Sequence, residues 1–181
     1  MANDDHGHNN THDNNTHDDG AADDEVLSPL FMLAVSMAFA IKVDGHISSQ
    51  QRGGLVALFG KLVEVGAINE GELHNLIGRA FTYAANNRVE DFIGKARTRL
   101  TETQKLAIVI NLYEAMQVDG HIKMGERGVV HKFEEAFAID PQTARGIHEF
   151  LTLKNDTSIF LDLAHPLNNT AIDLADLFRQ S

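Results

Sequence analysis

The sequence contains no cysteine in 181 residues. Because thiols form disulfides, supply thiolate metal ligands and carry thiol redox chemistry, this absence excludes all three. The chain also has no glycine-rich loop of the kind that cradles phosphates, since Gly53-Gly54 falls within a helical pattern. No residue outside the turns described below is an obvious general base beside an open metal site. We therefore predict that the protein is not an enzyme.

Basic residues and long apolar runs are also scarce. The chain has 15 Lys and Arg against 26 Asp and Glu, which gives a formal net charge of -11. This balance argues against binding to nucleic acid or to anionic lipid, both of which attract basic surfaces. The apolar run at 30–41 is shorter than the roughly 20 residues of a membrane-spanning helix, and the N-terminus lacks the pattern of a secretion signal. We expect a soluble cytoplasmic protein.

Residues 1–25 form a polar, acidic tail with no Lys or Arg. The pentapeptide Asn-Asn-Thr-His-Asp occurs there twice in succession, at 9–13 and 14–18. A segment with so little apolar surface to bury cannot offset the entropy lost on folding, so we expect disorder. Interspersed imidazoles could still chelate a transition metal loosely without a fold, and the candidates are His6, His8, His12 and His17.

The rest of the chain contains an internal duplication. Val43-Asp44-Gly45-His46-Ile47 returns as Val118-Asp119-Gly120-His121-Ile122, and Arg-Gly follows at the same offset each time. Repeated helix-turn-helix units of this kind define all-helical folds. We therefore predict an all-α domain over residues 26–156, with repeats at about 28–86 and 101–154, and a C-terminal helical extension over 157–181.

Local start and stop signals place the helices. Typical helix starts occur at Ser28-Pro29, Ser48 with Gln51, Asn69, Thr101 with Gln104, and Asp140-Pro141. Typical stops are Gly66 and the Asp-Gly pairs. No strand pattern is present. We predict helices at about 29–41, 48–65, 69–85, 89–97, 101–116, 123–138 and from 140 through 151, followed by an amphipathic helix after Pro166.

The duplicated turns carry the candidate metal ligands. Asp44 and Asp119 occupy equivalent positions, and Asp119 to Glu126 matches the second half of an EF-hand loop, although its first half is missing. Carboxylates brought together by the repeats would suit calcium, magnesium or manganese. The weaker candidates are Gln51, where the first repeat has no acid, and the histidines His46 and His121, which would favour zinc.

A purely structural role for the same residues is the alternative. Asp-Gly is ordinary turn chemistry between helices, because glycine accepts a positive φ and Asp bonds to nearby backbone N–H groups. Gln51 and Glu126 each lie three residues after a helix start, where a side chain commonly folds back on that start.

The chain has two apolar helices, each followed by a Val-Asp-Gly-x-Ile turn, and it also contains Glu126 and Phe137-Ala138-Ile139-Asp140-Pro141. In these features it resembles the TerB-like family of tellurite-resistance proteins. The resemblance covers about residues 30–154. It implies an all-α bundle of about seven helices in two pseudo-symmetric halves. It also implies metal binding through acidic residues, which here are Asp44, Asp119 and Glu126. Gln51 departs from the usual acidic residue, which places symmetric metal binding in doubt.

The resemblance further implies a non-enzymatic role in bacterial resistance to tellurite and related chemical stress. The expected partners are other tellurite-resistance and stress-response proteins, some of them at the inner membrane, and a divalent ion of calcium, magnesium, manganese or zinc is the expected ligand. A homodimer is compatible with the apolar C-terminal segment. The alternative function is a metal-independent helical adaptor or co-chaperone-like scaffold.

Overall fold

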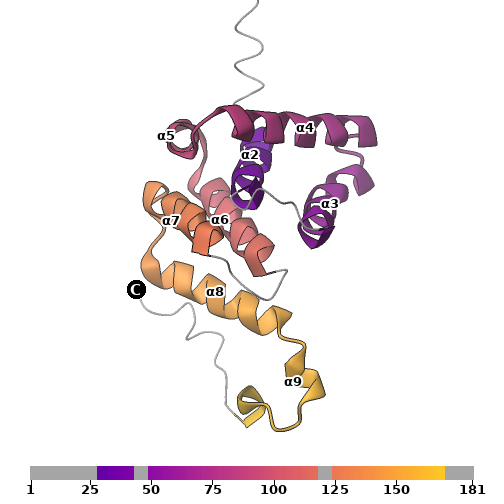
Figure 1. The fold of residues 1–181 in the computed structure, drawn as a ribbon, viewed down its shortest axis with the longest axis vertical. Helices are drawn as coiled ribbons and strands as arrows, with labels where there is room; N and C mark the ends of the chain where they lie inside the picture. Colours follow the sequence, from indigo (N-terminus) through magenta and orange to yellow (C-terminus); the bar gives the residue numbers. More distant parts are fainter. Residues whose placement is uncertain (1–27, 43–48, 118–123, 170–181) are drawn as a thin grey trace, which may run out of the picture.

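The structure, a computed structural model, describes residues 28–42, 49–117 and 124–169, and every regular element in these ranges is helical. This confirms the all-α prediction. The helices, labelled in Figure 1, are α2 (Pro29–Lys42), α3 (Ser49–Glu64), α4 (Glu70–Asn86), α5 (Val89–Arg99), α6 (Glu102–Gln117), α7 (Met124–Ala136), α8 (Pro141–Asn155) and α9 (Ser158–Leu161), with a final 3-10 turn, Pro166–Asn169.

Capping side chains explain where several helices begin. Asn69 and Glu72 form a reciprocal capping box at α4, with distances of 2.9 and 2.7 Å between the bonded atoms. Thr101 and Gln104 do the same before α6. Asp140 caps α8 by accepting bonds from two backbone N–H groups, and proline occupies the first helical position. The predicted starts at these three positions are therefore confirmed.

Left-handed backbone ends two helices. Gly66, just after α3, has a φ of 70°, which glycine adopts without steric cost and which confirms it as the predicted stop. Ala138 has a φ of 53°, so the chain turns two residues after α7 ends at Ala136. The predicted helix over 123–138 is accordingly shorter at its C-terminal end. No sequence signal marked Ala138, because a non-glycine residue is uncommon in that conformation.

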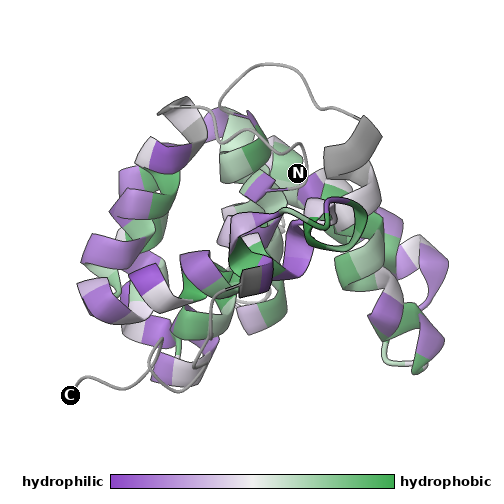
Figure 2. Ribbon diagram, turned by 90° about the horizontal axis from the view of Figure 1, so that it is seen from below, coloured by the Kyte–Doolittle hydropathy of each residue, from purple (hydrophilic) through white to green (hydrophobic). Residues whose placement is uncertain are grey.

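Helix α2 lies in the centre of the bundle and is buried on nearly every face. It packs against α4, α5, α6 and α7 (Figure 1). Met32 and Val35 are completely buried, and the hydroxyl of the buried Ser36 donates to the carbonyl of Met32 at 2.7 Å. The one buried polar side chain of this helix is therefore satisfied within it. Figure 2 shows hydrophobic residues turned toward the interior and hydrophilic residues on the outer faces.

A chain of aromatic contacts joins the helices around α2. Phe92 of α5 lies within ring-centroid distances of 5.5 Å from Phe39, 5.8 Å from Tyr83 and 6.2 Å from Phe133. Phe133 in turn lies 5.5 Å from Phe137, with the rings nearly perpendicular. Edge-to-face pairs of this kind add to the free energy gained from burial. They fix α7 against α5 and α2.

Helix α3 is packed less closely than α7, although the two begin 75 residues apart at Ser49 and Met124. α7 packs against α2, α5 and α6, whereas the packing of α3 is chiefly against α4. Phe133 of α7 is fully buried, whereas Leu58 of α3, 75 residues earlier in the chain, is half-buried. Val56 is 60% exposed. Grooves consequently open on both sides of α3.

The C-terminal part of the described chain extends away from this core. α8 packs against α6, and beyond it α9 and the 3-10 turn make a compact loop at the bottom of Figure 1. None of the helices in the described ranges combines the length and apolarity needed to cross a membrane. The predicted amphipathic helix after Pro166 falls mostly in residues 170–181, outside the described part.

Candidate functional site

The predicted ligands of the repeated turns lie outside the part of the chain that the structure describes. Asp44 and His46 fall in residues 43–48, and Asp119 and His121 fall in residues 118–123. The tail histidines His6, His8, His12 and His17 precede residue 28. Gln51 and Glu126 lie in the first turns of α3 and α7, but their side chains are not among those described. The described helix ends still define where the two turns begin and finish.

Both helices that lead into a turn are tied at their last residue to a helix of the same half of the chain. Lys42, the last residue of α2, donates from Nζ to the carbonyl oxygen of Ala84 in α4 at 3.3 Å. Gln117, the last residue of α6, donates from Nε2 to the carbonyl oxygen of His148 in α8 at 3.4 Å. Lys42 and Gln117 are 75 residues apart. The last residue of each helix that leads into a turn therefore makes a long-range hydrogen bond.

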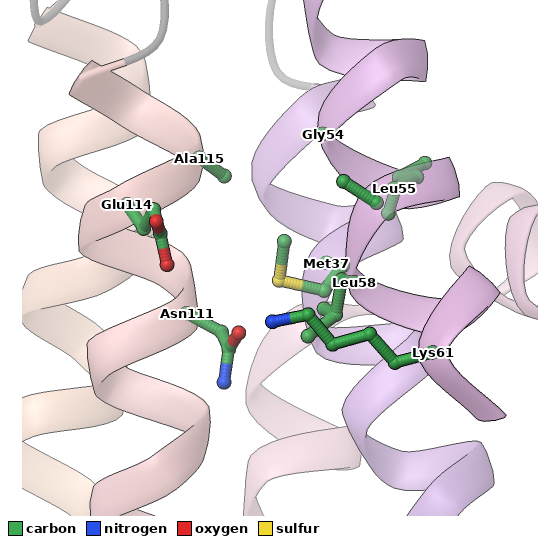
Figure 3. A pocket seen from close by; sticks show the side chains of 9 residues that line it. Met37, Gly54, Leu55, Leu58, Lys61, Asn111, Glu114 and Ala115 are labelled. Carbon is green, nitrogen blue, oxygen red and sulfur yellow. The ribbon is translucent and has the colours of Figure 1, made fainter. Parts of the chain in front are cut away.

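A groove lies between α3 and α6, over α2, and we call it the α3–α6 groove (Figure 3). Its volume is about 180 Å³. Small residues on facing helices leave this space open, and its lining is Met37, Gly54, Leu55, Ala57, Leu58, Lys61, Asn111, Glu114 and Ala115. Gly54 and Ala115 lie toward one end of the groove, and Lys61 and Asn111 toward the other. Because α3 begins at Ser49 and α6 ends at Gln117, the first end is the one next to both turns.

The rim of the α3–α6 groove is polar and its floor is apolar. Glu114 forms an ion pair with Lys154 of α8, and both side chains are about half exposed, so the pair adds little stability. The amide nitrogen of Asn111 donates to the carbonyl oxygen of Ala107 at 2.7 Å. Among the described residues, no carboxylate lies within ion-pair distance of Lys61. The groove thus presents the charged side chains of Lys61 and Glu114 and the amide of Asn111 beside apolar residues.

A second polar cluster lies between α6 and α7. The phenol of Tyr113 donates to Glu134, and His131 lies 3.3 Å from Glu134 through Nδ1 and 3.3 Å from Glu135 through Nε2. Burial, reinforced by the hydrogen bond to the Glu134 carboxylate, raises the pKa of Tyr113 above its usual value of 10. The cluster borders an open cavity of about 570 Å³ that also contacts Arg127.

Sequence reasoning did not identify this second cluster. Tyr113 and Glu134 are 21 residues apart on different helices, and neither belongs to a motif. His131 reads in the sequence as a single histidine within a helix. His131 and Glu134 are one helical turn apart in α7, and only the packing of α6 on α7 brings Tyr113 to Glu134.

The described part of the chain contains no group of three or more His, Asp or Glu side chains arranged to hold a metal ion. The candidate ligands of an ion therefore remain those of the two turns and of the tail.

Comparisons with protein-family models, with curated proteins and with solved structures found no match to this chain.

Proposed function

We propose that this protein is a non-enzymatic, TerB-like stress-response module that binds a divalent metal ion through Asp44, Asp119 and Glu126. In this proposal the two halves of the chain are pseudo-symmetric repeats, and each Asp-Gly turn contributes oxygen ligands. The module acts within an assembly of other tellurite-resistance and stress-response proteins in the cytoplasm, some of them associated with the inner membrane. The ion is the signal, and the helical body is the surface that partners bind.

The spacing of the helix ends carries this proposal. α2 and α6 end 75 residues apart, α3 and α7 begin 75 residues apart, and α2 packs against α6. The end of the α3–α6 groove that contains Gly54 and Ala115 adjoins the start of α3 and the end of α6. The two turns are therefore attached to helix ends on the same side of the bundle. Carboxylates on both turns could share one ion there.

The residue types of the turns indicate the class of ion. Carboxylates are hard oxygen donors, which suit calcium, magnesium or manganese. His46 and His121 follow the glycines and would shift the preference toward zinc if they were ligands. Gln51 replaces an acid in the first repeat, so the ligand set that we propose is asymmetric, with Glu126 supplying the additional carboxylate.

Calorimetric titration with calcium, magnesium, manganese and zinc tests the ion site. The background is the full chain with the four tail histidines, His6, His8, His12 and His17, changed to Asn, which removes loose chelation by the tail. Asp44→Asn with Asp119→Asn should abolish stoichiometric binding. A control double variant, Glu64→Gln with Glu149→Gln, removes the same charge from exposed helical positions and should bind as the background does. Equal binding by both double variants would refute the turn site.

A metal-independent helical adaptor is the second candidate. It is favoured by the apolar side chains that the loop containing α9 leaves exposed, because such surfaces bind protein partners without an ion. Under this function Asp44→Asn with Asp119→Asn lowers the melting temperature but leaves partner capture unchanged. Ion-dependent capture of a partner would favour the metal-responsive module instead.

A further inference from the structure

The loop that contains α9 exposes three large apolar side chains within residues 160–163. Phe160 is 85% exposed, Leu161 83% and Leu163 94%. We call these three residues the apolar tip. Single exposed apolar residues are common on protein surfaces, but neighbouring residues exposed to this degree typically mark a surface on which something docks.

Hydrogen bonds within the loop place the end of the described chain beside the apolar tip. The side-chain amide of Asn168 donates to the carbonyl oxygen of Ile159 at 3.0 Å and to that of Asp162 at 3.1 Å. These two carbonyl groups flank the first two residues of the tip in the sequence. Asn168 belongs to the 3-10 turn Pro166–Asn169, with which the described part of the chain finishes. The chain therefore continues into residue 170 from a point that is tied to both sides of the tip.

The sequence that follows, residues 170–181, has the pattern of an amphipathic helix. Its apolar residues recur at spacings of three and four, at Ala171, Leu174, Ala175 and Phe178. Asp173 and Asp176 lie on the opposite side of a helical projection. A helix of this length is about 18 Å long, which is enough to lie across three neighbouring side chains. Isolated helices this short are marginal in water, so such a segment needs a surface on which to pack.

We propose that residues 170–181 form a helix that packs on the apolar tip of the same chain. The segment begins two residues after Asn168, whose side chain is bonded beside the tip. A tether this short gives the segment an effective concentration at the tip on the order of millimolar. A second copy or another protein competes for the tip only when its own concentration approaches that value. A partner that uses the same side chains would have to displace the segment first.

Another apolar surface of the described chain lies farther from the start of the segment. A groove of about 410 Å³ opens between α3 and α4, and its lining includes Leu55, Val56, Leu73, Ile77 and Phe81. We call it the α3–α4 groove. In Figure 1, α4 lies at the top of the view and the loop that contains α9 at the bottom. The tip is therefore the nearer surface, and the groove is the alternative that an experiment must separate from it.

Hydrogen–deuterium exchange of the full chain, read by mass spectrometry on peptides from residues 170–181, tests the proposal. Docking should slow exchange of these amides by about tenfold or more relative to an unstructured peptide. A tip variant, Phe160→Ser with Leu163→Ser, should remove this slowing. Both positions are exposed, so the variant should fold. Val65→Ser, at a position that is 76% exposed in the turn after α3, is the matched control and should keep the slowing of the wild type.

Substitutions within the segment give the reciprocal test. Leu174→Ser with Phe178→Ser removes two of the apolar residues that share one side of the helix and should abolish the slowing. Asp173→Ser with Asp176→Ser changes the same number of residues on the opposite side and should leave the slowing in place. Equal effects of the two double variants would overturn the proposal, because they would show that no particular side of the segment is docked.

The remaining outcomes separate the tip from other sites. Exchange of residues 170–181 at the rate of an unstructured peptide in the wild type would overturn the proposal, as would slowing that survives the tip substitutions. Slowing that is lost in Val56→Ser and kept in the tip variant would assign the segment to the α3–α4 groove instead. Slowing that increases with protein concentration would assign the contact to a second copy, and slowing that requires phosphatidylcholine vesicles would assign it to a lipid surface. Each of these three results would also overturn it.

Discussion

Replacing Phe133 by alanine should destabilise the protein far more than replacing Leu58, although the two residues lie 75 residues apart, which is the offset between the duplicated turns. Phe133 is completely buried, and its ring lies 5.5 Å from that of Phe137 and 6.2 Å from that of Phe92. Leu58 is half-buried and borders the α3–α6 groove. In a bundle with two equally packed halves, the two substitutions would lower the free energy of unfolding by similar amounts.

The magnitudes follow from burial. Truncating a buried Phe to Ala costs about 3–5 kcal/mol, and the two lost ring contacts place Phe133 toward the upper end. A half-buried Leu already has water on one side, so Leu58→Ala should cost only about 1–2 kcal/mol. For a chain of this size the first change should lower the melting temperature by about 6–20 °C, and the second by a few degrees.

Urea unfolding followed by circular dichroism measures both changes. The midpoints should shift in the predicted order while the dependence on urea concentration stays constant, which shows that stability alone has changed. The inference that α3 is the loosely packed helix would be refuted if Leu58→Ala lowered the free energy of unfolding as much as Phe133→Ala, or more. It would also remove the physical basis for the grooves on either side of α3.

Two further predictions concern charged groups at helix starts and between helices. The Lys132 ammonium, 2.6 Å from Glu90, holds the pKa of Glu90 below its usual 4.5. Because the folded-state pKa is the lower one, the stability from this pair is present above about pH 4.5 and is lost as the pH falls through the folded pKa. Lys132→Met should therefore reduce the urea midpoint slightly at neutral pH and not at all in strong acid; a difference that grows on acidification would contradict this. Asp140→Ala removes the cap of α8, whose bonds to the backbone N–H groups of Gln142 and Thr143 are 3.0 and 2.9 Å long. It should cost about 1 kcal/mol in the same urea assay, and Asp140→Ser should recover most of that loss.

The positions of the helices could be predicted from sequence because the signals that start and stop them are local. A capping box needs only the residues from Asn69 to Glu72, and a left-handed stop needs only Gly66. The apolar character of α2 on all sides likewise indicates a central helix, because such a helix must be covered on every face. Each of these inferences depends on a few neighbouring residues and not on the rest of the fold.

Packing between distant residues could not be predicted in the same way. Leu58 and Phe133 both belong to apolar helical patterns, and only the arrangement of the helices makes one half-buried and the other fully buried. The hydrogen bond between Tyr113 and Glu134 joins two helices at a separation that no motif records. The exposure of Phe160 and Leu163 could not be predicted, because the expected helical extension over 157–181 does not indicate which of its residues are covered by the rest of the fold. The candidate turn ligands remain predictions from sequence.

The central position of α2 has a consequence for synthesis on the ribosome. α2 is the first described helix to emerge, yet α6 and α7, which cover much of it, end at Gln117 and Ala136. At the usual rates of about 5–20 residues per second, the chain from Lys42 to Ala136 takes roughly 5–20 s to be made. During that interval α2, which is more hydrophobic than each of the described helices α3 to α8, has no partner from the second half of the chain. Nascent chains stalled before α6 should therefore be the aggregation-prone species, and the order of the helices makes α2 a natural binding segment for a ribosome-associated chaperone.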